Sequence, residues 1–241
     1  MDKNIALIFA GGTGSRMGNV NLPKQFLLLG GKPIIAHTLD HFQGHSLIDK
    51  IAVVCVEGWI KHLESIVEAN NYTKVVSIVK GGDTGQQSIF NGLNAISKTC
   101  EVDDKTVVLI HDGVRPLIDE STITKCIDSV NEFGCTATTA SAVETIIEEE
   151  DGKVARVVDR SRCKLARAPQ GFRFAEIFDA HNKAREEGKT NFTDSVSLMS
   201  HYGFDIYTIE GPSNNIKITT RQDYFAFKGY MDYKEMGQLW S

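Results

Sequence analysis

A chain of 241 residues with 41% hydrophobic and 24% charged residues has the composition of a soluble globular protein and can bury a substantial core. Its 31 acidic and 26 basic residues give a net charge of −5, which excludes a general attraction to nucleic acid. No apolar run approaches the roughly 20 residues that a membrane span needs, so we expect no membrane partner.

The cysteines and the N-terminus indicate the compartment. Five widely spaced cysteines, at positions 55, 100, 126, 135 and 163, contain no C-x-x-C pair, which predicts reduced thiols and no zinc site. The segment Met1–Asn4 leads straight into a strand without a signal-peptide profile. We therefore expect a cytoplasmic protein.

The first predicted element is a short apolar strand, Ile5–Phe9, followed by a loop with Gly11, Gly12 and Gly14. Such a loop exposes consecutive backbone N–H groups, which suit phosphate oxygens. Arg16 and Lys24 add two positive charges, so we expect a polyphosphate there. The spacing fits neither a Walker A loop nor the G-x-G-x-x-G dinucleotide fingerprint. An ordinary glycine-rich turn is the structural alternative.

The next elements alternate between helix and strand. Apolar residues at helical spacing predict a helix over 34–42, and a β-branched run predicts a buried strand over Ile51–Val56. A second helix over 59–67 and a third strand, Val75–Val79, follow. This order predicts a parallel sheet covered on both sides by helices.

The loop after the third strand, residues 81–88, is a second candidate ligand segment because ligands bind at the carboxyl ends of such strands. Gly81 and Gly82 would allow close approach of a nucleobase, and Ser88 could donate to a phosphate or base. The alternative is a glycine turn with Thr84 capping the next helix.

The fourth strand, Thr106–Ile110, ends in the sequence H-D-G-V-R-P. Asp112, directly after this strand, is placed to contact a metal ion or a hydroxyl, and Arg115 could face a phosphate. His111 is more often a hydrogen-bonded structural residue than a catalytic one.

A helix over Ser121–Phe133, with Ser121 as its cap, and a strand over 134–142 come next. The charged segment 144–160 then predicts a hairpin with a turn at Asp151–Gly152. Its apolar side chains would be poorly covered in one chain, which favours an arm that packs on a second subunit. A solvated hairpin is the alternative.

The last quarter of the chain predicts helices over 175–187 and 193–201, with Asp194 capping the second, and a strand over 206–210. Lys217 lies between two apolar β-branched residues that would face the other way, which aims it into the cleft. A helix over 222–231 and a loosely held tail from Tyr233 to Ser241 close the chain. Without repeats or linkers, one domain over 1–241 is the economical prediction.

Five motifs together resemble a known family. They are G-G-T-G-S-R-M-G at 11–18, P-K-Q-F at 23–26, H-D-G-V-R-P at 111–116, A-P-Q-G-F at 168–172 and N-I-K-I-T at 215–219. The set is similar to the nucleotidyltransferases that make CDP-alcohols from CTP, the family of methylerythritol-phosphate and ribitol-5-phosphate cytidylyltransferases. The resemblance implies an α/β fold: a Rossmann-like, mostly parallel sheet flanked by helices, with a protruding β-arm at 143–165.

The resemblance also implies roles for individual residues. It implies a homodimer in which Thr145 and Arg160 of each arm contact the partner's alcohol-phosphate substrate. From the reaction and from the position of Asp112, we expect Mg²⁺ mainly on the phosphates, with Asp112 as its protein ligand. The residues expected to be catalytic are Arg16, Lys24, Lys217 and Arg160. Those expected to bind CTP are Ala10, Gly11, Gly12, Thr13, Gly14, Arg16, Lys24, Gly82, Asp83 and Ser88. Those expected to bind the acceptor are Asp112, Gly113, Arg115, Thr145, Arg160 and Lys217.

The hypothesis is an in-line attack of an alcohol phosphate on the α-phosphorus of CTP. The Ala-Gly-Gly start and the spacer before Pro23 favour ribitol 5-phosphate, for cell-surface polymer precursors, over methylerythritol 4-phosphate of isoprenoid synthesis. Gly85 and Ala168 stand where the family usually has Arg and Thr. Two alternatives of another class are a dinucleotide-dependent oxidoreductase, with Glu57 as its acid, and a non-catalytic nucleotide sensor.

Overall fold

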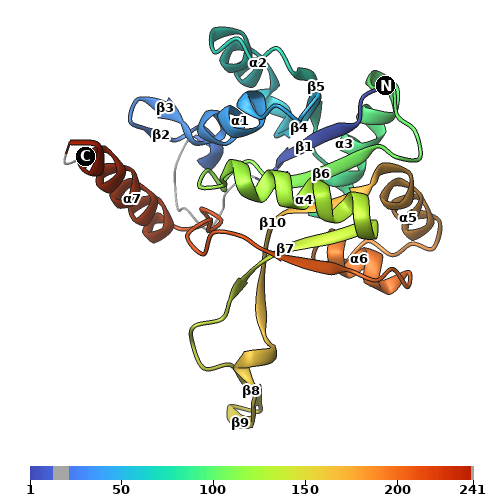
Figure 1. Cartoon of the computed structure of the whole chain (residues 1–241), viewed down its shortest axis with the longest axis vertical. Coiled ribbons are helices and arrows are strands. Elements are labelled where there is room, and N and C mark those ends of the chain that lie inside the picture. Colours follow the sequence, from blue (N-terminus) through green and yellow to red (C-terminus); the bar gives the residue numbers. More distant parts are fainter. Residues whose placement is uncertain (13–21, 240–241) are drawn as a thin grey trace.

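The computed structural model describes residues 1–12 and 22–239. Within these residues seven strands form one sheet in the spatial order β11, β7, β10, β6, β1, β4, β5 (Figure 1). The strands are β1 (Asn4–Ala10), β4 (Lys50–Cys55), β5 (Val75–Lys80), β6 (Val107–Asp112), β7 (Cys135–Ser141), β10 (Lys164–Arg173) and β11 (Tyr207–Glu210). Strands β5, β4, β1 and β6 run parallel, which confirms the predicted fold class.

Helices cover both faces of the sheet because neighbouring strand residues face opposite sides. In β1, Ala6 and Ile8 pack with α1, α2 and α4, whereas Ile5 and Leu7 pack with α3, α5 and α6. All four are fully buried. The covering helices are α1 (Ile34–Gly44), α2 (Ile60–Ala69), α3 (Gly85–Thr99), α4 (Glu120–Phe133), α5 (Phe174–Glu186) and α6 (Ser195–His201).

Strand β10 was not predicted, and it runs antiparallel to both neighbours, β6 and β7. Its first half therefore lies at the edge of the sheet where the parallel strands end. Ala166 lies opposite Thr139 and Gln170 opposite Ala137, so four steps along β10 match two along β7. This β-bulge takes residues 167–169 out of regular pairing. Bulges are common next to functional sites because they redirect side chains.

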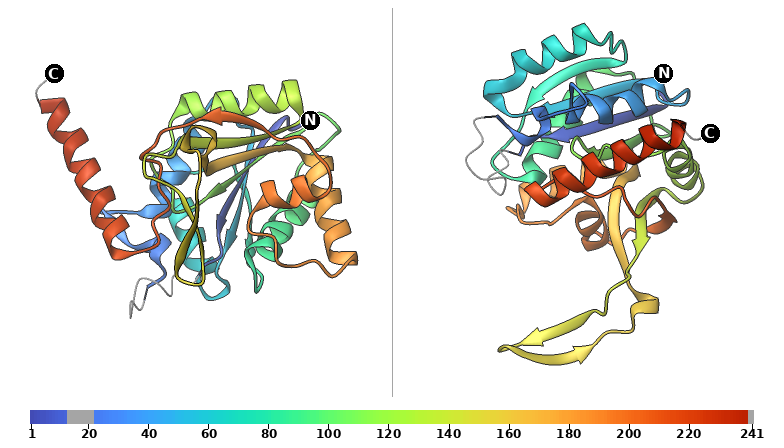
Figure 2. Two further views of the ribbon diagram at one scale, coloured as in Figure 1. Left: turned by 90° about the horizontal axis from the view of Figure 1, so that it is seen from below. Right: turned by 90° about the vertical axis from the view of Figure 1, so that its left-hand side faces the viewer.

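The predicted arm leaves the body between β7 and β10. It carries the hairpin of β8 (Ile147–Glu150) and β9 (Lys153–Val157), and Figures 1 and 2 show that this hairpin projects away from the sheet. Asp151 and Gly152 form its turn with φ of 51° and 76°, as a two-residue hairpin turn of this kind requires.

The apolar side chains of the arm are uncovered in the single chain. Ile147, Val154 and Val157 are 50%, 59% and 63% exposed. A two-stranded hairpin without a packed face has little stability of its own. The arm therefore has an apolar surface available for a further contact.

Two predicted details of the helices are wrong. Helix α4 is capped by Asp119, whose carboxylate accepts from the Thr122 N–H at 2.7 Å, and not by Ser121. Helix α7 (Arg221–Leu239) continues through most of the predicted tail and projects from the body (Figures 1 and 2). Phe227 anchors it in the core, and Tyr224 and Met231 are partly buried against the same cluster. Neither α7 nor another helix within 1–12 and 22–239 is both long and apolar enough to cross a membrane.

Candidate active site

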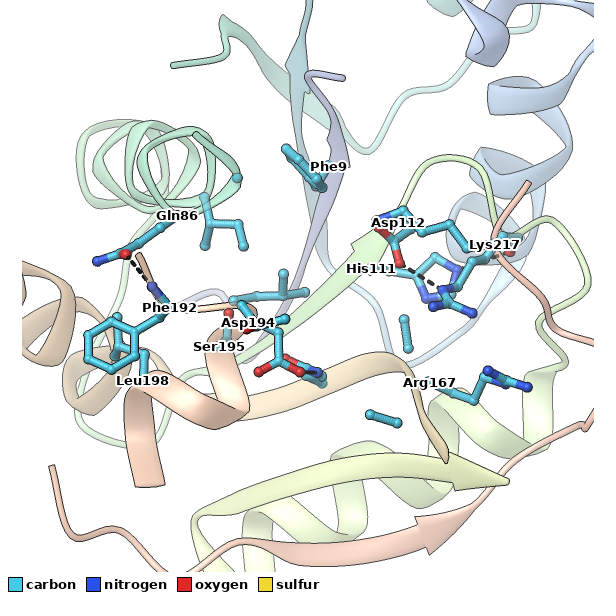
Figure 3. A pocket seen from close by; sticks show the side chains of 18 of the residues that line it. Phe9, Gln86, His111, Asp112, Arg167, Phe192, Asp194, Ser195, Leu198 and Lys217 are labelled. Carbon is cyan, nitrogen blue, oxygen red and sulfur yellow. Dashed lines mark hydrogen bonds and ion pairs between the residues drawn. The ribbon is translucent and has the colours of Figure 1, made fainter. Parts of the chain in front are cut away.

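The carboxyl ends of β1 and β6 open into a pocket of about 240 Å³ (Figure 3). Its lining comes from β1, β6, β10, α3, α5, α6 and the segment before α7, so residues far apart in the sequence meet here. Ligands of α/β sheets bind at this edge because loops and strand ends converge there. The motifs of the sequence predicted a ligand site at this edge.

Asp112, at the end of β6, holds two cations at the pocket. Its Oδ1 lies 2.6 Å from Lys217 Nζ, and its Oδ2 accepts a hydrogen bond from Arg115 Nε at 2.7 Å. Burial raises the pKa of the Asp112 carboxyl, but the charges of Lys217 and Arg115 outweigh this effect and lower it to about 2. The carboxylate stays ionised and fixes both cations. Together the three side chains leave one positive charge, which suits an anionic ligand.

Asn215 ties this group to β10, although the sequence analysis did not single it out. It is fully buried, its carbonyl accepts from Arg115 Nη1 at 2.9 Å, and its Nδ2 donates to the Ala168 carbonyl at 3.2 Å. Its position two residues before Lys217, in the N-I-K-I-T motif, is the sequence feature that could have identified it. Asn215 therefore connects the turn after β6, which carries Arg115, to the bulge in β10.

His111 has the structural role that the sequence favoured. Its ring is buried against Phe42, and its Nε2 lies 3.1 Å from the Arg115 carbonyl. Burial lowers the pKa of the imidazole to about 4. His111 is therefore neutral at neutral pH and supports the backbone that carries Arg115.

The loops after β1 and β5 meet with almost no space between their backbones. A Cβ added to Gly11 would lie 3.2 Å from Ser88 Oγ and 3.6 Å from Gly81 Cα. The hydroxyl of Ser88 accepts from the Gly82 N–H at 2.9 Å and donates to the Thr84 carbonyl at 2.9 Å. Ser88 is 2% exposed, so it shapes this loop from within.

The same loop also contains the predicted helix cap. Thr84 Oγ1 accepts from the Gln87 N–H at 3.1 Å at the start of α3. Asp83 is exposed, and its N–H donates to Gln87 Oε1 at 3.2 Å. The nucleotide contacts expected of Gly82, Asp83 and Ser88 stay predictions.

Lys24 lies beside the end of β1. It belongs to the short helix η2 (Lys24–Phe26), and the next residue, Gln25, donates from Nε2 to the Ala10 carbonyl at 2.8 Å. Lys24 is largely buried, at 9% exposure. Gly11 and Gly12 follow Ala10 within the described chain. Thr13, Gly14 and Arg16 lie outside the described residues, so their contacts with CTP stay predictions.

Comparison with known proteins identifies the family. The family model described as IspD, 2-C-methyl-D-erythritol 4-phosphate cytidylyltransferase, matches residues 4–232. The chain belongs to this cytidylyltransferase family. It is 46% identical over 238 residues to ribitol-5-phosphate cytidylyltransferase of Streptococcus agalactiae serotype V, a match that covers 98% of each chain.

Two further comparisons agree with this family. The chain is 40% identical over 225 residues to 2-C-methyl-D-erythritol 4-phosphate cytidylyltransferase of Clostridium acetobutylicum, covering 92% of this chain and 95% of that one. The solved 4-diphosphocytidyl-2C-methyl-D-erythritol synthase of Anaerococcus prevotii superposes with a TM-score of 0.81 at 26% identity, covering 96% and 99% of the two chains. The cytidylyltransferase is therefore a nucleotidyltransferase, as the motifs predicted.

The oxidoreductase alternative loses its support in this family. Glu57, its expected acid, is exposed after the end of β4 and pairs with Lys80 at 3.1 Å. Neither residue lines the pocket described above.

Thr145 and Arg160 of the cytidylyltransferase lie outside the pocket of their own chain. Both are exposed at the base of the arm, and Arg160 Nη1 donates to the Val143 carbonyl at 2.6 Å. Neither residue is part of the pocket lining. The structure of one chain therefore brings Asp112, Arg115 and Lys217 together but not these two.

Gly113 and Gly85 of the cytidylyltransferase both lie near β1, but they differ in how closely other atoms surround them. A Cβ at Gly113 would lie 3.0 Å from Ala10 Cβ, so this glycine lets the ends of β6 and β1 pack closely. At Gly85 the nearest atom would be Phe9 Cζ at 3.9 Å. The glycine at 85 therefore leaves space in the pocket wall.

The described protein donors offer little to a metal ion. Within residues 1–12 and 22–239, no three or more His, Cys, Asp or Glu side chains are grouped to hold one. Both carboxylate oxygens of Asp112 are paired with Lys217 and Arg115, so these two cations would compete with Mg²⁺ for this carboxylate. The predicted Mg²⁺, carried mainly by substrate phosphates, stays a prediction.

Proposed function

We propose that this cytidylyltransferase joins CTP and ribitol 5-phosphate to give CDP-ribitol and pyrophosphate, a step that supplies precursors of cell-surface polymers. The observation that carries the proposal is the 46% identity, over 98% of both chains, to a ribitol-5-phosphate cytidylyltransferase. The positive pocket formed by Asp112, Arg115 and Lys217 suits two phosphorylated substrates. Methylerythritol 4-phosphate is the second candidate acceptor, favoured by the description of the family model.

In the proposed reaction a phosphate oxygen of the acceptor attacks the α-phosphorus of CTP, and the bond from this phosphorus to the bridging oxygen of pyrophosphate breaks. Such transfers need positioning and charge neutralisation more than covalent help. Lys24 and Arg16 hold the triphosphate, Lys217 holds the attacking phosphate or the α-phosphate, and Arg115 orients the acceptor. Mg²⁺, when bound, supplies further neutralisation on the triphosphate oxygens.

Pyrophosphate release from CTP with a panel of alcohol phosphates tests the proposal. The panel contains ribitol 5-phosphate, methylerythritol 4-phosphate, glycerol phosphate and mannitol phosphate. We expect kcat/KM for ribitol 5-phosphate to exceed the others by at least about tenfold, equivalent to roughly 1.4 kcal/mol in transition-state binding. A higher value for methylerythritol 4-phosphate would instead assign the second acceptor. CTP binding without pyrophosphate release for any acceptor would indicate a sensor.

The whole chain, 1–241, acts in this proposal as one nucleotidyltransferase domain with the arm 143–165 as its dimer contact. The exposed Ile147, Val154 and Val157 support an association that buries the arm on a second copy. Thr145 and Arg160 then reach the partner's acceptor. The five free cysteines support action in the reducing cytoplasm.

Mixed dimers test whether the arm acts on the partner's site. Arg160→Ala damages only the arm, and Lys217→Ala damages only the pocket. If arms act in trans, co-expression of these two inactive variants restores one intact site per mixed dimer, about a quarter of all sites with random pairing. Pyrophosphate release measures the recovery. No recovery, with mixed dimers demonstrated by two different affinity tags, would contradict an arm that works in trans.

A further inference from the structure

Arg167 is a third cation at the pocket, and no group in the described chain neutralises it. It lines the pocket with Arg115 and Lys217. Its side chain has no hydrogen bond or ion pair within residues 1–12 and 22–239, and its Nε is buried without a partner. Figure 3 shows Arg167 at the same end of the pocket as Asp112 and Lys217, with Phe192 and Leu198 at the opposite end.

The surroundings of Arg167 are unfavourable for a cation in the absence of an anion. Burial, and after it the charge of Arg115, lower the pKa of the Arg167 guanidinium, which nevertheless stays protonated in proteins. The side chain is only partly buried, so the unfavourable contributions are the desolvation of its buried Nε and the repulsion from Arg115.

Both carboxylates of the pocket wall are engaged elsewhere, and neither forms an ion pair with Arg167 in the described chain. Asp112 pairs with Lys217 and Arg115. The oxygens of Asp194 accept from the Ser197 N–H at 2.8 Å, as the predicted cap of α6, and from Gln170 Nε2 at 2.9 Å. A bound anion would therefore supply a partner that the described residues do not.

The position of Arg167 in the sheet indicates which anion this is. Arg167 lies on β10, next to β6 and on the side away from β1 and β5, whose loops meet at Gly11 and Gly81. The β-bulge at 167–169 also removes Arg167 from regular pairing with β7. The nucleotide loops and Arg167 thus lie on opposite sides of β6.

We propose that Arg167 binds the phosphate group of the alcohol-phosphate acceptor. A guanidinium can present two parallel N–H groups to phosphate oxygens, and the bound phosphate would pair the buried Nε and offset the repulsion from Arg115. This inference rests on the proposed function, because it takes an alcohol phosphate as the second substrate. Arg167 is then a residue that determines acceptor affinity and leaves CTP affinity unaffected.

Arg167→Ala tests this assignment, with the best acceptor of the panel as substrate. We expect KM for the acceptor to rise by about tenfold or more, as for loss of a charge-assisted contact, with an unchanged dissociation constant for CTP in calorimetry without acceptor. Arg167→Lys should recover part of the loss because it keeps the charge but not the fork. Lys61→Ala, on the exposed surface of α2, is the matched control for removing one positive charge.

The outcomes separate the two proposals. An unchanged acceptor KM in Arg167→Ala, with wild-type activity, would overturn the role of Arg167 and leave the proposed function intact. Equal weakening of CTP and acceptor, with a lower melting temperature, would indicate a structural role and overturn it as well. No pyrophosphate release by the unmodified enzyme with any acceptor would overturn the proposed function.

Discussion

Replacement of Lys217 by alanine is expected to lower kcat/KM for cytidylyl transfer by about 10²–10³-fold, the usual loss for one preorganised group that faces transition-state charge. The reason is geometric. Asp112 fixes the ammonium group at 2.6 Å, so it meets the growing negative charge without reorganising. Removing it also cancels the net positive charge of the group formed with Arg115. Pyrophosphate release under single-turnover conditions measures the chemical step.

Two controls separate the role of Lys217 from that of a partner for Asp112. Lys217→Arg keeps the charge and should retain more activity than Lys217→Ala. In Lys217→Ala the Asp112 carboxylate keeps only Arg115 as its partner. The double variant Asp112→Asn with Lys217→Ala removes this carboxylate as well. If this double variant recovered wild-type activity, Lys217 would serve only to neutralise Asp112.

Replacement of Lys24 by alanine is expected to lower kcat by about 10²-fold while the protein stays folded and still binds CTP. Gln25 anchors the short helix η2 to the Ala10 carbonyl, so the lysine is held beside the loop that follows β1. There it can neutralise the charge that develops on the leaving pyrophosphate. Pyrophosphate release gives kcat, and calorimetry gives CTP affinity.

The matched control for Lys24 is Lys32→Ala. Lys32 is close in the sequence, carries the same charge and pairs with Asp40. We expect near wild-type kcat for this variant. A fall in kcat of less than about tenfold for Lys24→Ala, equivalent to roughly 1.4 kcal/mol, with fold and CTP affinity kept, would show that Lys24 is not the transition-state cation.

The central strands of the parallel half, β1, β4 and β6, could be predicted because they are buried on both faces. The predicted strand Ile51–Val56 and the observed strand Lys50–Cys55 differ by one residue at each end. The continuous run of apolar side chains is typical of a strand that is covered on both faces. Strand β10 could not be predicted in the same way. Its Arg167 and Pro169 argue against a strand, and the structure accommodates them in a bulge.

The C-terminal end of α7 could not be predicted from the sequence either. The apolar spacing that predicted the last helix stops at Met231, which packs on the core near Phe227. Beyond it, Tyr233 and Met236 are 70% and 55% exposed, so neither extends the apolar stripe of a buried helix face. The helix continues without the signal on which the prediction depended.

The sequence predicted that Lys217 and Arg115 lie at the same edge of the sheet but not how they are held. Both were singled out from their motifs, and Asp112 was expected to contact a metal ion or hydroxyl. In the structure Asp112 pairs with both cations. Such pairing between distant segments has no local sequence signal. Asn215, which connects Arg115 to Ala168, escaped notice for the same reason.

The irregular stretch of β10 has a consequence for how this enzyme can evolve. Regular pairing resumes at Gln170, so the side chains at 167 and 168 contribute nothing to the ladder with β7. Ala168 is buried, whereas Arg167 is only partly buried, so position 167 is the one whose side chain can change without leaving a cavity in the sheet. If Arg167 binds the acceptor as we propose, a lineage can change its acceptor by substitution at 167 while the residues that handle CTP stay as they are.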